Sequence, residues 1–75
     1  MDELIEFIAK SLVEDPSAVR VSMTPRRGEI RVELSVADED MGRVIGRGGR
    51  VANAMRALLR VAASQEGSRA SLEIV

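Results

Sequence analysis

The sequence contains no cysteine and no histidine, and each absence removes a class of chemistry. Without cysteine there are no disulfide bonds and no thiolate nucleophile, and without either residue the usual zinc ligands are missing. Without histidine the chain lacks the side chain that most often serves as a general base. No apolar run approaches the roughly 20 residues that a membrane-spanning helix needs. We therefore expect neither an enzyme nor a membrane protein, and no metal or other cofactor.

The chain is short, and its composition is that of an ordinary folded domain. Its 75 residues allow one small domain, residues 1–75, and 45% of them are hydrophobic. A net charge of only −1 argues against disorder. The first ten residues carry acidic side chains where a secretion signal needs positive charge, so we expect a cytoplasmic protein. This composition suits a binding module better than an enzyme.

The small net charge hides an uneven distribution. Residues 1–15 contain five acidic side chains and one lysine. Residues 41–65 contain no acidic residue and five arginines, namely Arg43, Arg47, Arg50, Arg56 and Arg60. Such a stretch is either a solvated helix face or a local binding site for an anion, and the charge pattern alone leaves both interpretations open.

The first half of the chain predicts a helix followed by a β-hairpin. Apolar residues recur at helical spacing over residues 2–13, and Pro16 ends that helix. Residues 18–24 and 29–36 alternate between apolar and polar side chains, as strands with one buried face do. The four residues from Pro25 to Gly28 have the composition of a turn, so the two strands should pair antiparallel.

The second half of the chain predicts two helices and a final strand. Asp38 is expected to cap a short helix with a solvated first turn, and a longer helix is expected to follow the glycines and end near Gln65. Residues 70–75 alternate again, which makes the order α-β-β-α-α-β. We predict an α+β fold in which helices pack on one face of a three-stranded sheet. In the longer helix, the expected buried residues are Val51, Ala54, Met55, Leu58, Leu59 and Ala62, and the expected outward residues are Asn53, Arg56, Arg60 and Ser64.

The glycine cluster Gly46-Arg47-Gly48-Gly49 has several possible interpretations. A dinucleotide-binding fingerprint would need glycine or alanine at position 51, which is valine, and a strand immediately before the turn. A P-loop would need a Gly-Lys-Ser/Thr tripeptide, which the chain lacks. A tight turn between two helices remains. It is either an ordinary corner or an anion site where backbone amides at a helix N-terminus approach a phosphate. Spacing alone does not separate these two.

The same segment carries a resemblance to a known family. The residues from Val44 to Val51 resemble the VIGxxGxxI signature of the KH domain. Just ahead, Asp40-Met41-Gly42-Arg43 resembles the segment that precedes this signature in bacterial members. The order of predicted elements is similar to the type II, prokaryotic KH arrangement, and the resemblance extends over the whole chain. Its pattern resembles that of the small standalone bacterial KH proteins of the KhpA family.

This resemblance implies a site for single-stranded RNA. In KH domains a GxxG loop, here Gly46 to Gly49, grips the backbone of about four nucleotides. The bases would lie in an apolar groove whose opposite wall is the third strand near Leu72, with residues 65–69 at its edge. A chain whose only aromatic residue is Phe7 fits this module better than modules that stack bases on aromatic rings. The implied RNA-binding residues are Arg43, Val44, Ile45, Gly46, Arg47, Gly48, Gly49, Arg50, Val51 and Ala54.

The resemblance also implies a cellular role and a partner. It implies an RNA chaperone that acts with a larger KH-domain protein of the KhpB type and influences cell shape and envelope synthesis. A homodimer is the other expected assembly. The alternative function, from another class, is a KH-fold protein-interaction module that does not bind RNA. The adjacent acids Asp38, Glu39 and Asp40 are interpreted as a helix cap with a solvated first turn rather than as a metal site.

One loop position departs from the family pattern. Gly48 stands where many KH domains carry a charged or polar residue, so three of the four loop residues are glycine. A loop this rich in glycine loses more conformational entropy when it is ordered by a ligand. We therefore expect Gly48→Lys to strengthen RNA binding.

Overall fold

The order of elements in the computed structural model, which describes residues 1–75, is α-β-β-α-α-β, as the sequence predicts. The helices and strands are α1 (Asp2–Leu12), β1 (Arg20–Arg26), β2 (Glu29–Ser35), α2 (Met41–Ile45), α3 (Arg50–Gln65) and β3 (Arg69–Ile74). Single turns of 3₁₀ helix occur at Pro16–Ala18, Asp38–Asp40 and Arg47–Gly49. No helix is both long enough and apolar enough to cross a membrane.

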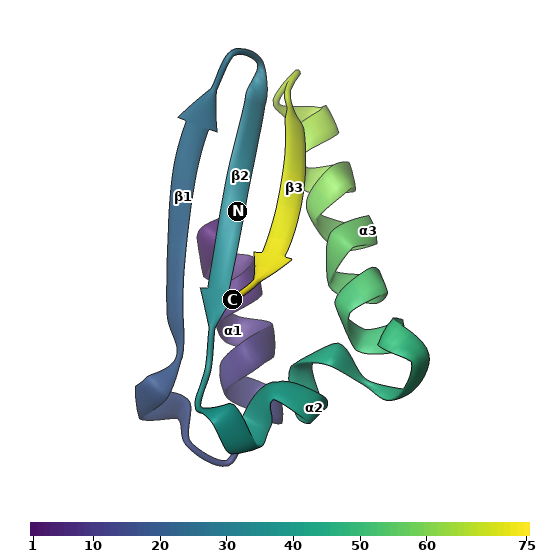
Figure 1. Ribbon diagram of the computed structural model, residues 1–75. Coiled ribbons are helices and arrows are strands. Elements are labelled where there is room, and N and C mark those ends of the chain that lie inside the picture. Colours follow the sequence, from purple (N-terminus) through teal and green to yellow (C-terminus); the bar gives the residue numbers. More distant parts are fainter.

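The three strands form one mixed sheet in the order β1-β2-β3 (Figure 1). β1 and β2 pair antiparallel, with Arg20 opposite Ser35, which confirms the predicted hairpin. β3 pairs parallel to β2, with Glu29 opposite Arg69. A parallel neighbour requires a long crossover connection, and α2, the glycine turn and α3 supply it. Because the strand order is β1-β2-β3, β3 is an edge strand, and α3 runs beside it (Figure 1).

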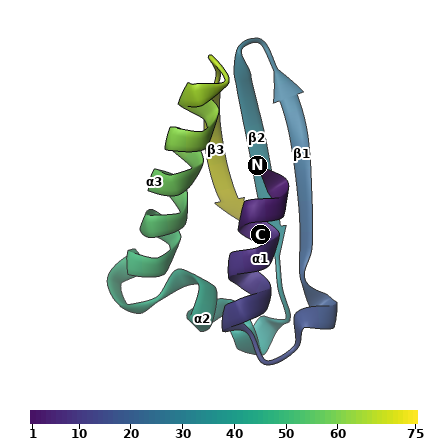
Figure 2. The same ribbon diagram turned by 180° about the vertical axis from the view of Figure 1, so that it is seen from behind.

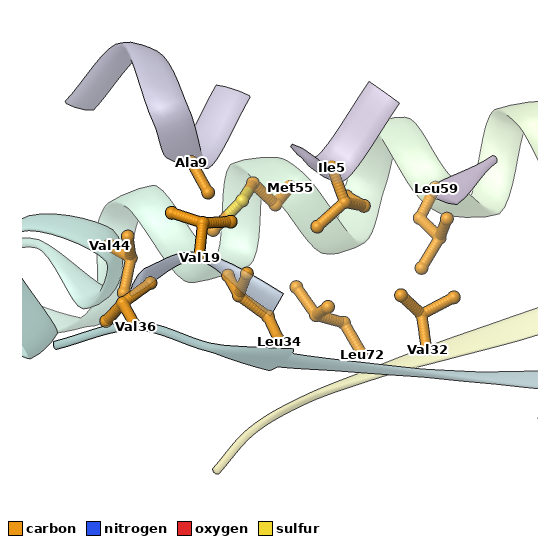
Figure 3. Packing of buried hydrophobic residues seen from close by; sticks show 10 residues of the cluster. All are labelled: Ile5, Ala9, Val19, Val32, Leu34, Val36, Val44, Met55, Leu59 and Leu72. Carbon is orange, nitrogen blue, oxygen red and sulfur yellow. The ribbon is translucent and has the colours of Figure 1, made fainter. Parts of the chain in front are cut away.

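Helices α1 and α3 cover the same face of the sheet, which Figure 2 shows from the helical side. This packing follows from the strand pattern, because alternate side chains point to opposite faces and only one face is apolar. Figure 3 shows side chains from the helices meeting those from the strands in one core. The core residues are Ile5, Ala9, Val19, Val32, Leu34, Val36, Val44, Met55, Leu59 and Leu72. The predicted α+β architecture, with helices on one face of a three-stranded sheet, is confirmed.

The hairpin turn is tighter than the composition predicts. Pro25 and Arg26 belong to β1, and only Arg27 and Gly28 connect the two strands. Proline is compatible with this position because β1 is an edge strand, in which a missing N–H need not break a ladder hydrogen bond. Gly28 has a φ of 66°, which helps two residues to reverse the chain.

The buried face of α3 is rotated from the predicted one. Ala54 and Leu58 were expected in the core, but both are exposed, Leu58 to 49%. Apolar residues cover a wider arc of this helix than the sheet can bury, and the sequence does not show which part of that arc faces the sheet. The residues of α3 that are buried are Ala52, Met55, Leu59 and Ala63.

Candidate nucleic-acid interface

The turn between α2 and α3, residues Gly46 to Gly49, is called the glycine loop below. Its three glycines all have positive φ angles, of 77° at Gly46, 65° at Gly48 and 80° at Gly49. The N–H of Gly46 donates to the Gly42 carbonyl at 2.9 Å, and the N–H of Gly49 donates to the Gly46 carbonyl at 3.1 Å. Residues with side chains rarely adopt such angles, so the glycines are what allow so short a turn to join the two helices.

At Gly46 the packing requires glycine as strictly as the backbone does. A Cβ atom at this position would lie 2.6 Å from Cγ2 of Val51 and 2.9 Å from the Val51 backbone nitrogen. Both distances are too short for non-bonded atoms, so a side chain at position 46 would displace the first turn of α3. Gly48 is different, because a Cβ atom there would meet nothing within 4 Å and only the backbone conformation is restrictive.

The glycine loop brings positive charge and a helix N-terminus to one exposed place. α3 begins at Arg50, and no side chain caps its first turn. Unpaired amides of a first helical turn and the helix dipole both attract an anion. Arg47 and Arg50 are exposed, and neither takes part in an ion pair. The surface has no enclosed pocket, so a ligand of this loop would lie along the surface.

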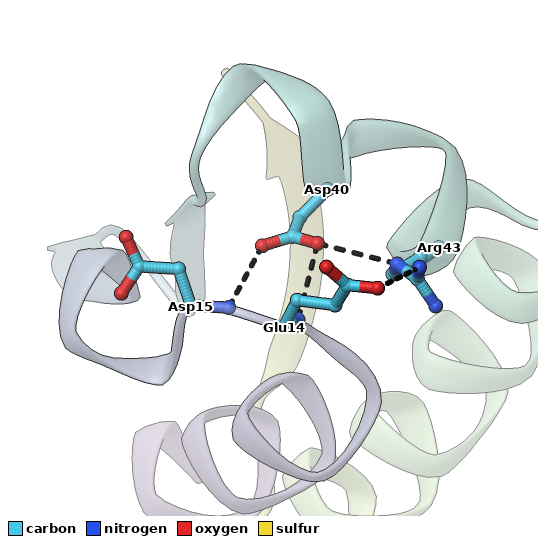
Figure 4. Close-up of polar contacts among 4 residues, drawn as sticks. All are labelled: Glu14, Asp15, Asp40 and Arg43. Atoms are coloured by element: carbon cyan, nitrogen blue, oxygen red, sulfur yellow. Dashed lines mark hydrogen bonds and ion pairs between the residues drawn. The ribbon is translucent and has the colours of Figure 1, made fainter.

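Unlike Arg47 and Arg50, Arg43 takes part in ion pairs, although the sequence predicted it as an RNA-binding residue beside the loop. Its Nη2 donates to Oε1 of Glu14 at 2.6 Å, and its Nε lies 3.3 Å from Oδ1 of Asp40 (Figure 4). Two carboxylates therefore hold the guanidinium on the side of α2 that faces the end of α1. Arg43 thus supports α2, and its charge is shared with two carboxylates, unlike that of Arg47 and Arg50.

Asp40 is the centre of this cluster and is buried, with only 1% of its surface exposed. Its Oδ1 accepts the backbone N–H of Glu14 and its Oδ2 that of Asp15, both at 3.1 Å (Figure 4). The interpretation of Asp40 as part of a solvated first turn is wrong, because its carboxylate satisfies backbone amides that follow α1. The expected N-cap at Asp38 is also wrong, since Ala37 precedes the turn and no side chain caps it. No three acidic side chains come together to hold a metal ion.

The apolar residues around the loop differ in what they offer to a ligand. Val44 was predicted to line the RNA groove, but it is fully buried in the core and presents no surface to a base. Ile45 is 37% exposed, and Val51 is half-buried against Gly46. Counted from Gly49, the last apolar position of the KH signature falls on Ala52, which is buried, and not on Val51.

Asn53 and Arg56 were both expected on the outward face of α3, and Arg56 also belongs to the basic stretch. In the structure they connect α3 to the unpaired edge of β3. Nε of Arg56 donates to the Leu72 carbonyl at 3.3 Å, and Nη1 donates to Oδ1 of Asn53 at 3.1 Å. Asn53 adjoins the loop, because a Cβ atom at Gly49 would lie 3.7 Å from its Nδ2. The glycine loop, this flank of α3 and the edge of β3 therefore form one continuous surface. The family resemblance implied the third strand near Leu72 as a wall of the groove, but nothing in the sequence shows that Asn53 and Arg56 lie on the flank of α3 that meets it.

Ala54, another predicted RNA-binding residue, lies on the other flank of α3. Successive helical residues rotate by about 100°, so Ala54 and Arg56 are about 200° apart around the axis. Leu58 and Val61 follow Ala54 at i+4 and i+7 and are 49% and 60% exposed. These three residues form an exposed apolar surface that we call the α3 stripe, and the structure does not bring it together with the edge of β3.

The sequence matches a known family over nearly its whole length. The family model described as KhpA/KhpB, KH domain, matches residues 2–74. The chain is 48% identical over 75 residues to proteins named RNA-binding protein KhpA from Caldanaerobacter subterraneus and Clostridium acetobutylicum, and each alignment covers 100% of both chains. It is 45% identical to the protein of the same name from Treponema pallidum, over 99% of this chain and 92% of that one. No solved structure matches.

Proposed function

The chain belongs to the KhpA/KhpB family of KH domains, and from this premise we propose that it binds single-stranded RNA across the glycine loop. The observation that carries the proposal is the geometry of that loop. Gly46 tolerates no side chain, and the loop leads directly into a helix N-terminus that no side chain caps. Relatives of full-length similarity bear the name RNA-binding protein, which supports the same conclusion.

In the proposed complex the sugar–phosphate backbone lies along the glycine loop. The missing Cβ atoms let a phosphate approach the backbone amides closely, and the dipole of α3 favours its negative charge. Arg47 and Arg50 add positive charge that no neighbouring acid neutralises. The bases extend from the loop past Ile45 towards the free edge of β3. Arg43 contributes indirectly, by fixing the helix that precedes the loop.

We extend the proposal to a protein partner, because one small site with few phosphate contacts binds weakly by itself. Joining two such sites raises the effective concentration of the second and strengthens binding without new contacts. The partner is a second copy of this chain or a larger KH-domain protein of the KhpB type. We assign the α3 stripe to that pairing, since exposed apolar side chains grouped on one flank are typical of an interaction surface. Together the two domains act as a cytoplasmic RNA chaperone with effects on cell shape and envelope synthesis.

A second candidate function is a KH-fold protein-interaction module that does not bind RNA. The α3 stripe favours it, because Leu58 and Val61 are exposed without a partner in the monomer. The glycine loop argues against it. A module that no longer binds RNA has no need of two unpaired arginines at this loop, and no acidic residue replaces them.

The proposal is tested by charge reversal at the loop against charge reversal elsewhere. Arg47→Glu with Arg50→Glu should abolish the binding of a labelled single-stranded RNA measured by fluorescence anisotropy. The control is Arg26→Glu with Arg27→Glu at the hairpin, where two exposed arginines also lack an ion-pair partner. It makes the same change in net charge and should retain most of the affinity. Equal losses in both variants would mean that the attraction is non-specific, and no binding by the unaltered protein would favour the interaction module.

A further inference from the structure

The guanidinium of Arg56 is the only arginine head group that is fixed at the surface between the glycine loop and β3. Its Nε is held by the Leu72 carbonyl at 3.3 Å and its Nη1 by Oδ1 of Asn53 at 3.1 Å. It forms no ion pair with any acidic side chain. No acidic side chain therefore neutralises the charge of this arginine, and two neutral acceptors set its orientation.

The direction of the Leu72 carbonyl places this head group at the outer edge of the sheet. Backbone groups of successive strand residues point to opposite edges. The N–H of Arg69 donates to the Gly28 carbonyl at 3.1 Å, so the odd-numbered residues of β3 face β2. The Leu72 carbonyl therefore points to the unpaired edge, and Arg56 meets it there. A strand of RNA that leaves the glycine loop along β3 passes this guanidinium.

Most of the hydrogen-bonding capacity of Arg56 is unused. A guanidinium carries five N–H donors in one plane, and the two hydrogen bonds to Leu72 and Asn53 use two of them. Three donors remain, and they lie in a plane whose orientation is already fixed. A fixed planar fork of donors is suited to two adjacent acceptors on one flat group.

We propose that Arg56 is a base-reading residue of this KH domain and that it selects a base with two adjacent hydrogen-bond acceptors. This inference rests on the proposed RNA-binding function. Two bases have such a pair: guanine at O6 and N7, and unpaired cytosine at N3 and O2. Adenine and uracil present a donor beside each acceptor on their exposed edges. Contacts of the loop to phosphates carry no sequence information, so Arg56 supplies selectivity at one nucleotide of an otherwise tolerant site.

The experiment uses short single-stranded oligoadenylates that carry one central guanosine, cytidine or uridine. The unaltered protein should bind the guanosine or the cytidine oligomer about 5- to 150-fold more tightly than the adenylate and uridine oligomers, the range expected for one bidentate arginine–base pair. The guanosine and cytidine arms identify which base is read. Equal affinities for all four oligomers overturn this inference and leave the proposed function standing, whereas no binding of any oligomer overturns both.

The variant Arg56→Lys distinguishes the effect of the planar N–H donors from the effect of the positive charge. Lysine keeps the positive charge but lacks the planar donors, so the preference for one base should fall to within about twofold of none, whether or not the affinity for the adenylate oligomer changes. Arg60→Lys is the matched control, because Arg60 is exposed one turn further along α3 and makes no hydrogen bond or ion pair. Retention of the preference in Arg56→Lys, or its loss in Arg60→Lys, contradicts the assignment.

A second test leaves the protein unaltered and is therefore independent of folding. Replacing the central guanosine by 7-deazaguanosine removes the N7 acceptor, and replacing the cytidine by 3-deazacytidine removes N3. The preferred oligomer should lose its advantage when its acceptor pair is broken. An undiminished preference for the deaza oligomer would show that some other group reads the base.

Discussion

Nη2 of Arg43 lies 2.6 Å from Oε1 of Glu14, so the helix that precedes the glycine loop is joined to the segment that follows α1. Both side chains are largely solvated, with exposed fractions of 49% and 75%, and an exposed pair of this kind contributes only about 0–1 kcal/mol. The stronger part of the connection is Asp40, which is buried and accepts two backbone amides from the same segment. The position of α2, which precedes the glycine loop, therefore depends on Asp40 more than on Arg43.

The first prediction follows from that difference. Asp40→Ala leaves the amides of Glu14 and Asp15 without their acceptor, and it should lower the free energy of unfolding by about 3 kcal/mol. Asp38→Ala is the control, because Asp38 is exposed and caps nothing, and it should change stability by less than about 0.5 kcal/mol. Urea denaturation followed by circular dichroism measures both. Similar stabilities for the two variants would contradict the role of Asp40.

The second prediction concerns two glycines four residues apart. Gly46→Ala should destabilise the protein by about 2–3 kcal/mol and abolish RNA binding, because its Cβ would clash with Val51 and its backbone conformation suits only glycine. Gly42→Ala should stabilise the protein by about 0.5–1 kcal/mol, since Gly42 is in α2 and a Cβ there meets nothing within 4 Å. Thermal unfolding combined with an RNA titration distinguishes the two. A stable, RNA-binding Gly46→Ala variant would refute the steric account.

The third prediction refines the expected effect of a lysine in the loop. Gly48 has a φ of 65°, so Gly48→Lys should reduce stability by about 1 kcal/mol. That strain is present in the free and in the bound loop, so it should not weaken RNA binding. The added charge and the reduced flexibility should still raise affinity a few-fold. Asparagine tolerates the left-handed conformation and adds no charge. Gly48→Asn should therefore change both the stability and the RNA affinity less than Gly48→Lys does. An unchanged or lower affinity of Gly48→Lys in a titration would remove the hypothesis.

The fourth prediction tests which arginines contact phosphates. Each phosphate contact to a single strand adds about 0.7 to the slope of log affinity against log salt concentration. Arg47→Gln and Arg50→Gln should each reduce the slope by about 0.7, whereas Arg43→Gln should leave it unchanged because Glu14 and Asp40 already hold that side chain. Binding measured between low and moderate salt gives the three slopes. A reduced slope in Arg43→Gln would return Arg43 to the RNA contacts.

Patterns that are local in the sequence predicted the fold well. The alternation in residues 29–36 and the apolar spacing in residues 2–13 each depend on one element, and both gave the correct element. The position of the glycine loop could be predicted for the same reason. The buried face of α3 could not, because its apolar residues, Leu58 among them, extend beyond the part that the sheet covers.

The contacts that the sequence could not predict are those between distant segments. Asp40 looked like part of a solvated cap, but its partners are backbone amides 25 and 26 residues away. Arg43 looked free because the carboxylate of Glu14, with which its Nη2 pairs, lies 29 residues away in the sequence. Arg56 was expected on an outward face, and nothing in the sequence shows that its Nε meets the Leu72 carbonyl. Polar residues whose partners are backbone atoms leave no complementary charge in the sequence that could reveal them.

The central claim is that single-stranded RNA lies along the glycine loop, and a nuclear magnetic resonance titration tests it most directly. Isotope-labelled protein would be titrated with a pool of short single-stranded RNAs at low and at moderate salt. The account predicts salt-sensitive shifts at residues 45–53, extending to Arg56 and Leu72, with none at the hairpin. An absence of shifts in the glycine loop at protein concentrations near one millimolar would contradict it.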